Sequence, residues 1–198
     1  MEILKLSPKN LKKAVKKTAK LLEGGGVIVC PTDTVYGLIA DAFNSKAVKK
    51  IFKIKKRPKT KPLGVFVENI SRVKKLALVD AKQEKFLEKN TPGKITVILK
   101  KKIDCNLADL VGTKRTIGIR IIKNKFINEL LKKIKKPLAQ TSANISGRKT
   151  PNNIEEIIKQ FNRSKLKPDL IIDAGALPKR KPSKIIDLTS GKPKVLSR

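Results

Sequence analysis

The sequence contains no histidine, and its only cysteines are Cys30 and Cys105. The absence of histidine excludes Ser-His-Asp triads and the common metal sites that use imidazole ligands. Two isolated cysteines without a CxxC spacing also argue against a zinc site and against a disulfide framework. Whatever chemistry this chain carries out must therefore use other side chains.

Long apolar segments are missing as well. No run approaches the roughly 20 apolar residues of a membrane-spanning helix, and the N-terminal MEILKLSPKN lacks the apolar stretch of a secretory signal. We therefore predict a cytoplasmic protein that does not associate with a membrane. No internal repeat or low-complexity linker divides the 198 residues, and a hydrophobic content of 39% is enough to form a core. Residues 1–198 are predicted to form a single domain.

Acidic residues are scarce: the chain has 16 Asp and Glu but 48 Lys and Arg, and the formal net charge is +32. The lysines are spread over nearly every surface-like segment, and aromatic residues, which single-strand binders use for stacking, make up only 4%. Two interpretations stay open: a general lysine bias of the surface, or a face that binds polyanions. In either case the field of the protein should attract ATP and tRNA.

Hydrophobic periodicity predicts alternating helices and strands. Ser7 and Pro8 are suited to begin a first helix, which Gly24-Gly25-Gly26 ends. Further helices are predicted from Asn44 or Ser45 to just before Pro58, and at about residues 70–79, 81–89, 125–134 and 152–161. Strands are predicted at residues 27–30, 63–67, 95–100 and 116–122, just before the loop that begins at Thr141, and at 169–173 and 184–188.

This order of elements predicts a single α/β domain with a mixed sheet. The helices that connect strands imply some parallel pairs, and the closely spaced strands of the tail imply antiparallel ones.

Two polar segments near the start of the chain are candidates for a binding site. The loop PTDTVYGL, residues 31–38, presents hydroxyl groups near backbone amides, which suits a small polar ligand; an ordinary polar turn is the alternative. Lys55 and Arg57 lie where a helix gives way to a loop, and their cations could clamp a triphosphate. In so basic a chain, a solvated surface is the alternative.

Two later segments complete the set of candidates. Arg120 lies in the apolar strand TIGIRII, where its burial is costly unless an anion or an acidic side chain pairs with it. A structural salt bridge is the alternative. The loop that contains Ser142, Asn144, Gly147 and Thr150 has small polar side chains that would let a phosphate approach the backbone. It is not a GxxxxGK[ST] loop, and no GxGxxG occurs in the chain.

In this order, the segments resemble the conserved blocks of the YrdC-like threonylcarbamoyl-AMP synthase family. The resemblance covers almost the whole chain, to the terminal KVLSR. The sequence resembles the short form of the family, which lacks an extra C-terminal domain. It is carried by GGGVIVCPTDTVYGL, KIKKRPKTKPL, TPGKITVILKK, TIGIR, TSANISG, DLIIDAG and SKIIDLT. It implies a twisted mixed parallel and antiparallel sheet, flanked by helices, with a basic concave face.

The resemblance also implies an activity. A member of this family condenses L-threonine, bicarbonate and ATP to threonylcarbamoyl-AMP and pyrophosphate, as a nucleotidyltransferase acting for threonylcarbamoyladenosine formation in tRNA. It implies that Thr32, Thr34, Tyr36 and Arg120 bind L-threonine, with Arg120 on the carboxylate. It implies catalytic roles for Lys55, Arg57 and Ser142, and an ATP site made of these three residues with Thr116, Asn144, Thr150 and Arg198.

Other implied partners are a downstream threonylcarbamoyl transferase complex and double-stranded RNA or tRNA. Mg²⁺ is expected to arrive with ATP, without a metal site in the protein and without an organic cofactor. Phe66 stands where many relatives have a histidine that helps to enclose threonine. The main alternative is a non-catalytic protein that binds double-stranded RNA or tRNA.

Overall fold

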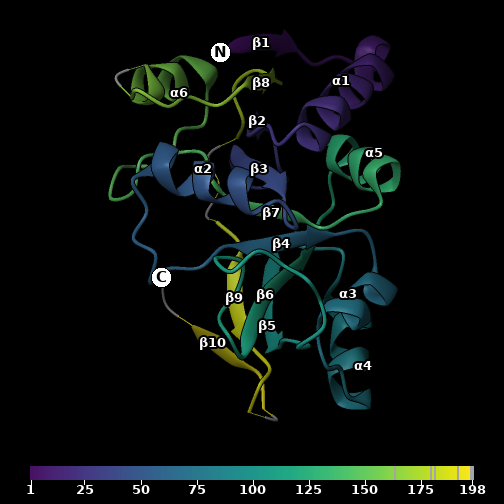
Figure 1. Ribbon diagram of the computed structural model, residues 1–198. Coiled ribbons are helices and arrows are strands. Elements are labelled where there is room, and N and C mark those ends of the chain that lie inside the picture. The colour runs from purple at the N-terminus through teal and green to yellow at the C-terminus, as the bar shows by residue number, and fades with distance from the viewer. Residues whose placement is uncertain (163, 179, 181, 191, 197–198) are drawn as a thin grey trace.

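The computed structural model describes residues 1–162, 164–178, 180, 182–190 and 192–196. Within this part of the chain ten strands form one sheet with helices packed around it (Figure 1). The strands are β1 (Glu2–Lys5), β2 (Ile28–Cys30), β3 (Gly37–Asp41), β4 (Gly64–Val67), β5 (Ile95–Lys100), β6 (Thr116–Ile121), β7 (Leu138–Ser142), β8 (Leu170–Asp173), β9 (Lys184–Asp187) and β10 (Lys194–Leu196).

The helices begin where an Asn or Asp side chain caps them. Five α-helices have such a residue before their first turn, and its oxygen accepts a backbone N–H of that turn. The helices are α1 (Leu11–Glu23), α2 (Ser45–Lys55), α3 (Ile70–Leu76), α4 (Ala81–Asn90), α5 (Lys125–Ile134) and α6 (Ile154–Phe161), with a short 3₁₀ turn, Pro8–Asn10, before α1.

The sheet is mixed, as predicted, in the order β1-β8-β2-β3-β7-β4-β6-β5-β9-β10. Parallel pairs are β1–β8, β2–β8, β4–β6 and β5–β9, and the other pairs are antiparallel. Strands at the two ends of the sheet run in clearly different directions in Figure 1, which is the twist that the resemblance implied.

The pairing predicted for the tail was wrong. The strands β8 and β9 do not pair with each other; each joins the sheet through parallel neighbours, near its opposite ends. The described residues of the connection between them, 174–178, 180, 182 and 183, therefore run along the molecule (Figure 1). Only β9 and β10 form an antiparallel pair in the tail.

Other differences concern short strands. The segment predicted as a loop at residues 31–38 ends earlier, because β3 begins at Gly37 and all its residues are buried. The strands β1 and β10, both short and largely exposed edge strands, had no predicted counterpart.

Each face of the sheet has its own apolar core. On one face, α2, α3, α4 and α6 cover the sheet with residues such as Ile51, Val73 and Ile157. On the other face, only α1 and α5 provide a cover, through residues such as Leu22 and Leu130. No helix in the described residues is long and apolar enough to cross a membrane.

Candidate active site

The candidate site is a small open hollow of about 40 Å³ on the face of the sheet that α1 and α5 cover. Because side chains alternate along a strand and registered partners point to the same side, Ser142, Gln140, Phe66 and Arg120 share this face. The hollow is lined by Thr32, Thr34, Val35, Gly37, Phe66, Arg120, Gln140, Thr141, Ser142, Pro182 and Ser183. The structure therefore brings four predicted site residues, Thr32, Thr34, Arg120 and Ser142, to one place.

Thr32 organises the loop at the rim of the hollow. Its hydroxyl donates to the carbonyl oxygen of Val35 at 2.6 Å and accepts the backbone N–H groups of Thr34 (3.0 Å) and Val35 (3.2 Å). The hydroxyl oxygens of Thr32 and Thr34 lie 3.1 Å apart. A hydroxyl fixed in this way holds the loop in one shape, so Thr34 faces the hollow in a defined position.

Arg120 is 4% exposed and forms an ion pair with Asp33, whose side chain is 8% exposed; the distance from Nη2 to Oδ1 is 2.5 Å. The guanidinium also donates to Thr34 Oγ1 at 3.4 Å and to the carbonyl oxygen of Gly93 at 3.3 Å. It lies 5.9 Å from the centre of the Phe66 ring, within the range of a cation–π contact.

The structure contains the salt bridge that the sequence analysis gave as the alternative explanation for Arg120, and the contact of Arg120 with a substrate carboxylate stays a prediction. A carboxylate of the chain, that of Asp33, already pairs with it. The physical reason is the one that makes a buried arginine costly: a guanidinium in an apolar strand requires a counter-ion. The pair occupies Nη2, and Arg120 still lines the hollow.

The side chain of Lys55 forms hydrogen bonds with the end of β7 and with the loop that follows it. Its ammonium group, 2% exposed, donates to the carbonyl oxygens of Ser142 and Asn144, each at 2.6 Å, and to Asn144 Oδ1 at 3.0 Å. Ser142 Oγ donates to the same Oδ1 at 2.6 Å. The backbone of Lys55 contributes too, because its carbonyl oxygen accepts the N–H of Ser146. Lys55 thus ties the end of β7, where Ser142 lies, to the loop that follows.

The electrostatics of Lys55 are unusual. Its three ammonium hydrogens face neutral oxygens, and no carboxylate of the described residues forms an ion pair with it. Burial, with a smaller contribution from the nearby Arg57 cation, lowers the pKa of Lys55 from 10.5 to about 7. Because a buried cation without a counter-charge is unfavourable, this position favours the binding of an anion nearby.

Arg57 supports the segment after α2. It donates through Nε to the carbonyl oxygen of Lys61 at 2.6 Å and through Nη2 to that of Pro62 at 3.1 Å. Burial lowers the pKa of Arg57, although a guanidinium stays protonated at neutral pH. Both cations predicted to face phosphate are therefore also bonded to the backbone of neighbouring loops.

The remaining predicted residues lie outside the lining of the hollow. Tyr36 is fully buried, and its hydroxyl donates to the carbonyl oxygen of Gly175 and accepts the N–H of Ala174, so it anchors the start of the β8–β9 connection. Thr116 is on the same face of β6 as Arg120 and bonds with Thr113. Thr150 is half-buried in the loop after β7, and Arg198 lies outside the described residues.

Sequence reasoning did not identify Gln140, Pro182 or Ser183 as lining residues, or Asp33 as the partner of Arg120. Ser183 belongs to the β8–β9 connection and its hydroxyl lies 2.9 Å from Thr96 Oγ1, in the adjacent strand β5. The connection is also tied to the 31–38 loop, since Arg180 donates to the carbonyl oxygen of Asp33 at 3.1 Å. A contact between segments 147 residues apart leaves no local pattern in the sequence.

The arrangement can bind a small amphoteric molecule next to an anion. Hydroxyl and amide groups and a guanidinium surround the hollow, and a buried ammonium lies under the loop at one end. Such a site can position reactants and stabilise negative charge, but the described residues that line it include no acid or base suited to strong proton transfer.

These features define an α/β protein with a small polar-ligand site on one face of the central strands of a mixed sheet. The family described as "Telomere recombination", Sua5/YciO/YrdC, matches residues 20–198. The chain belongs to this family.

Three relatives illustrate the match. A Methanocaldococcus jannaschii protein, named provisionally as a threonylcarbamoyl-AMP synthase, is 38% identical over 97% of this chain and 88% of its own. A Pyrococcus abyssi threonylcarbamoyl-AMP synthase is 31% identical over 92% of this chain but only 53% of its own. The uncharacterised Escherichia coli protein YciO is 30% identical over 92% of this chain and 87% of its own.

Two solved structures agree with the fold. The crystal structure of P. abyssi Sua5 complexed with L-threonine matches with a TM-score of 0.85 at 28% identity, covering 98% of this chain and 56% of that one. The crystal structure of E. coli YciO has the same TM-score and identity, with 93% of its chain covered. This chain thus spans little more than half the length of some relatives and most of the length of others.

Proposed function

We propose that this protein is an L-threonylcarbamoyladenylate synthase. The observation that carries the proposal is the hollow that gathers Thr32, Thr34, Arg120 and Ser142 beside the buried ammonium of Lys55. It is supported by the similarity to proteins named threonylcarbamoyl-AMP synthase and to a Sua5 structure that contains L-threonine.

The reaction would proceed in two steps. The amine of L-threonine attacks the carbon of bicarbonate, which gives a carbamate and releases water. A carbamate oxygen then attacks the α-phosphorus of ATP, and pyrophosphate leaves. Neither step requires a histidine, and the second depends on positioning and on stabilising phosphate charge. Because the second step transfers the adenylyl group of ATP to the carbamate, the enzyme is a nucleotidyltransferase.

We assign the binding roles from the geometry of the hollow. The loop ordered by Thr32 presents the Thr34 hydroxyl to the amino acid, and Arg120 attracts its carboxylate. Ser142 and the neighbouring backbone face the phosphates, while Lys55, held under the same loop, supplies positive charge from below. Lys55 therefore positions the segment around Ser142 and Asn144, which we propose faces the phosphates.

The remaining partners follow from the chemistry. Mg²⁺ enters with ATP, held by phosphate oxygens and water; the described residues hold no group of three His, Cys, Asp or Glu side chains suited to a metal. Bicarbonate, tRNA, a downstream threonylcarbamoyl transferase and a cytoplasmic location are proposed with the activity. The product, a mixed carbamic–phosphoric anhydride, requires an enzyme that transfers its acyl group to a nucleophile.

The decisive measurement is pyrophosphate release from ATP with and without L-threonine and bicarbonate. We expect release only when both are present. L-Serine should be used less well, since one methyl in an apolar pocket is worth about 1–3 kcal/mol, and L-valine should be rejected more strongly because it lacks the hydroxyl. Release that is equal with valine, or independent of any amino acid, would contradict the proposal.

The alternative, a non-catalytic RNA-binding protein, is favoured only by the net charge of +32. It does not explain a buried ammonium beneath a loop rich in hydroxyl groups or the polar hollow beside Arg120. Tight binding of duplex RNA without pyrophosphate release under any condition would favour it.

A further inference from the structure

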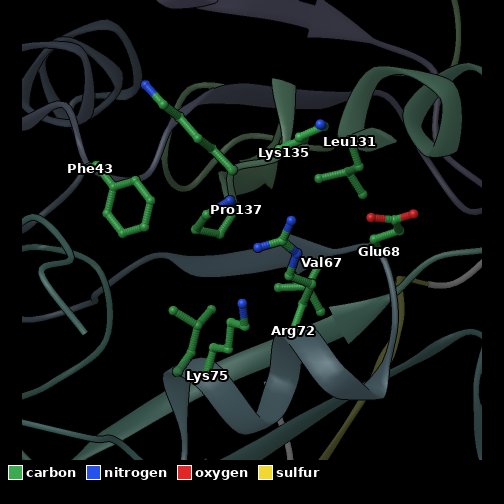
Figure 2. A pocket seen from close by; sticks show the side chains of 10 residues that line it. Phe43, Val67, Glu68, Arg72, Lys75, Leu131, Lys135 and Pro137 are labelled. Atoms are coloured by element: carbon green, nitrogen blue, oxygen red, sulfur yellow. The ribbon is translucent and has the colours of Figure 1, made fainter. Parts of the chain in front are cut away.

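A second hollow, of about 100 Å³, lies where β3 and β4 end and β7 begins, between α3 and α5 (Figure 2). Its inner surface is apolar, formed by the buried side chains of Val67, Leu76 and Leu131 and by Pro137. Phe43, a large apolar side chain that is 39% exposed, stands at its side. Exposed aromatic surface next to a concave apolar floor is typical of a ligand pocket.

Cations surround this apolar floor. Arg72 projects from α3 toward Pro137, with the Lys75 ammonium close to it, and Lys135 lies on the opposite side (Figure 2). Within the described part of the chain, no ion pair joins any of these three to a carboxylate. A fourth lining cation, Lys136, is neutralised by Asp41 at 2.8 Å.

This second hollow is separate from the candidate active site. Consecutive residues of β4, Phe66 and Val67, line the two hollows, and they point to opposite faces of the strand. The linings of the two hollows share no residue. A ligand in the second hollow would not compete sterically with one in the first.

We propose that the second hollow binds a small carboxylate that carries a planar apolar ring. The ring would pack on Pro137 beside Phe43, and the carboxylate would pair with the Arg72 guanidinium, whose fork suits a planar anion. Glu68, the one carboxylate that lines the hollow, opposes an anion on its own side and so favours a ligand with one charged end directed toward Arg72. The proposal does not depend on the proposed enzymatic activity.

The test uses 2-naphthoate as the probe, titrated into the full-length protein by isothermal calorimetry, with ligand-observed NMR to detect ring contacts. Two comparison compounds separate the parts of the ligand: 2-naphthalenemethanol has the ring without the charge, and acetate has the charge without the ring. We expect saturable 1:1 binding of 2-naphthoate and much weaker binding of both comparison compounds.

Variants locate the site. Arg72→Ala removes the anion partner and Phe43→Ala removes the aromatic wall, and each should weaken 2-naphthoate binding about tenfold, as expected for one charge-assisted contact or one buried ring. Lys133→Ala, on an exposed part of α5, removes the same unit of charge outside the hollow and should leave the affinity unchanged.

Three outcomes would overturn the proposal: absence of saturable binding, equal binding by 2-naphthalenemethanol, or equal loss of affinity in Lys133→Ala and Arg72→Ala. Circular dichroism of each variant establishes that it is folded. If Phe43→Ala does not fold, Phe43→Leu keeps the apolar contact and tests the ring alone.

Discussion

Lys55 is the residue in which stability and function conflict most clearly. Its ammonium is buried without a carboxylate partner, and its hydrogen bonds all go to neutral oxygens of the loop that follows β7. Desolvation of a charge is expensive, and hydrogen bonds to neutral groups offset it only in part. The arrangement is understandable if an anion supplies the missing charge when the substrate binds.

A pH-dependent stability follows from the lowered pKa of Lys55. Between the folded-state value of about 7 and the unfolded value near 10.5, the unfolded chain binds more protons, so the free energy of unfolding contributed by Lys55 rises with pH in this window. Lys55→Met removes this contribution. We expect the stability of the original protein, relative to Lys55→Met, to increase from pH 7 to pH 9, by at most about 1.4 kcal/mol per pH unit.

Denaturant unfolding of both proteins at pH 6, 7.5 and 9 measures the effect, and only the pH-dependent part of the difference matters. Parallel stability profiles would show that Lys55 stays protonated in the folded protein. Proton uptake on ATP binding at pH 7.5, measured by calorimetry in buffers of different ionisation enthalpy, is the corresponding expectation for the bound state.

The Arg120–Asp33 pair yields a second prediction at this scale. Asp33→Asn removes a carboxylate that pairs with the buried guanidinium and should destabilise the fold, by up to about 3–5 kcal/mol. If Arg120 also receives the substrate carboxylate, L-threonine should raise the melting temperature of Asp33→Asn more than that of the original protein. An equal shift in both proteins, with a large loss of stability, would make Arg120 a structural residue only.

Among the elements, β4 and β6 approach closely at the floor of the active-site hollow. A Cβ atom added to Gly64 would lie 2.9 Å from the carbonyl oxygen of Gly118 and 3.2 Å from Gln140 Nε2. Glycine is required here because the neighbouring backbone cannot give way. The strand β4 pairs with β6 on one side and with β7 on the other, so it lies between Arg120 and Gln140.

Gly64→Ala should therefore lower stability by about 1–3 kcal/mol through overpacking and reduce pyrophosphate release by displacing Gln140. The matched control is Gly24→Ala at the end of α1, where an added Cβ would make only ordinary contacts of 3.6 Å and should change stability by less than about 1 kcal/mol. Thermal unfolding and turnover are measured on both. Similar effects of the two substitutions would show that β4 can shift away from β6.

Helices and most strands could be predicted from the sequence because their signals are local. Asn44 before α2 and the apolar spacing in α1 are examples. The strand β3 was not predicted, because GLIAD is short, buried throughout and without the alternation that marks a half-exposed strand. The predicted pairing of the strands in the tail was wrong for a different reason. Closeness in sequence does not determine which strands are neighbours in a sheet.

The same distinction applies to the site. The hydroxyl and cationic residues could be selected by type, and four of them line one hollow. Their partners could not, because the contact of Arg120 with Asp33 spans 87 residues and that of Lys55 with Asn144 spans 89. Such contacts exist only after the sheet has formed, so the sequence indicated the candidate residues but not their bonding state.

The whole molecule carries far more positive than negative charge, 48 Lys and Arg against 16 Asp and Glu, which gives +32. Only a few lysines of the described residues are paired with carboxylates. Uncompensated like charges repel one another and destabilise the compact state relative to the more open unfolded chain. The basic concave face remains a prediction, but this repulsion holds whichever face the charges occupy.

Salt should therefore stabilise the folded protein. The Debye length falls from about 14 Å at 0.05 M to about 4 Å at 0.5 M ionic strength, so added NaCl screens repulsion between lysines that are one helix turn or more apart. A gain of about 1 kcal/mol would raise the melting temperature by about 2–4 °C for a chain of this size, and most of the increase should occur below 0.2 M. Thermal unfolding in a NaCl series measures the effect, with sucrose as the uncharged control for exclusion effects. A melting temperature that is flat or falls with NaCl would mean that the six ion pairs found between described residues contribute more than the remaining charges cost.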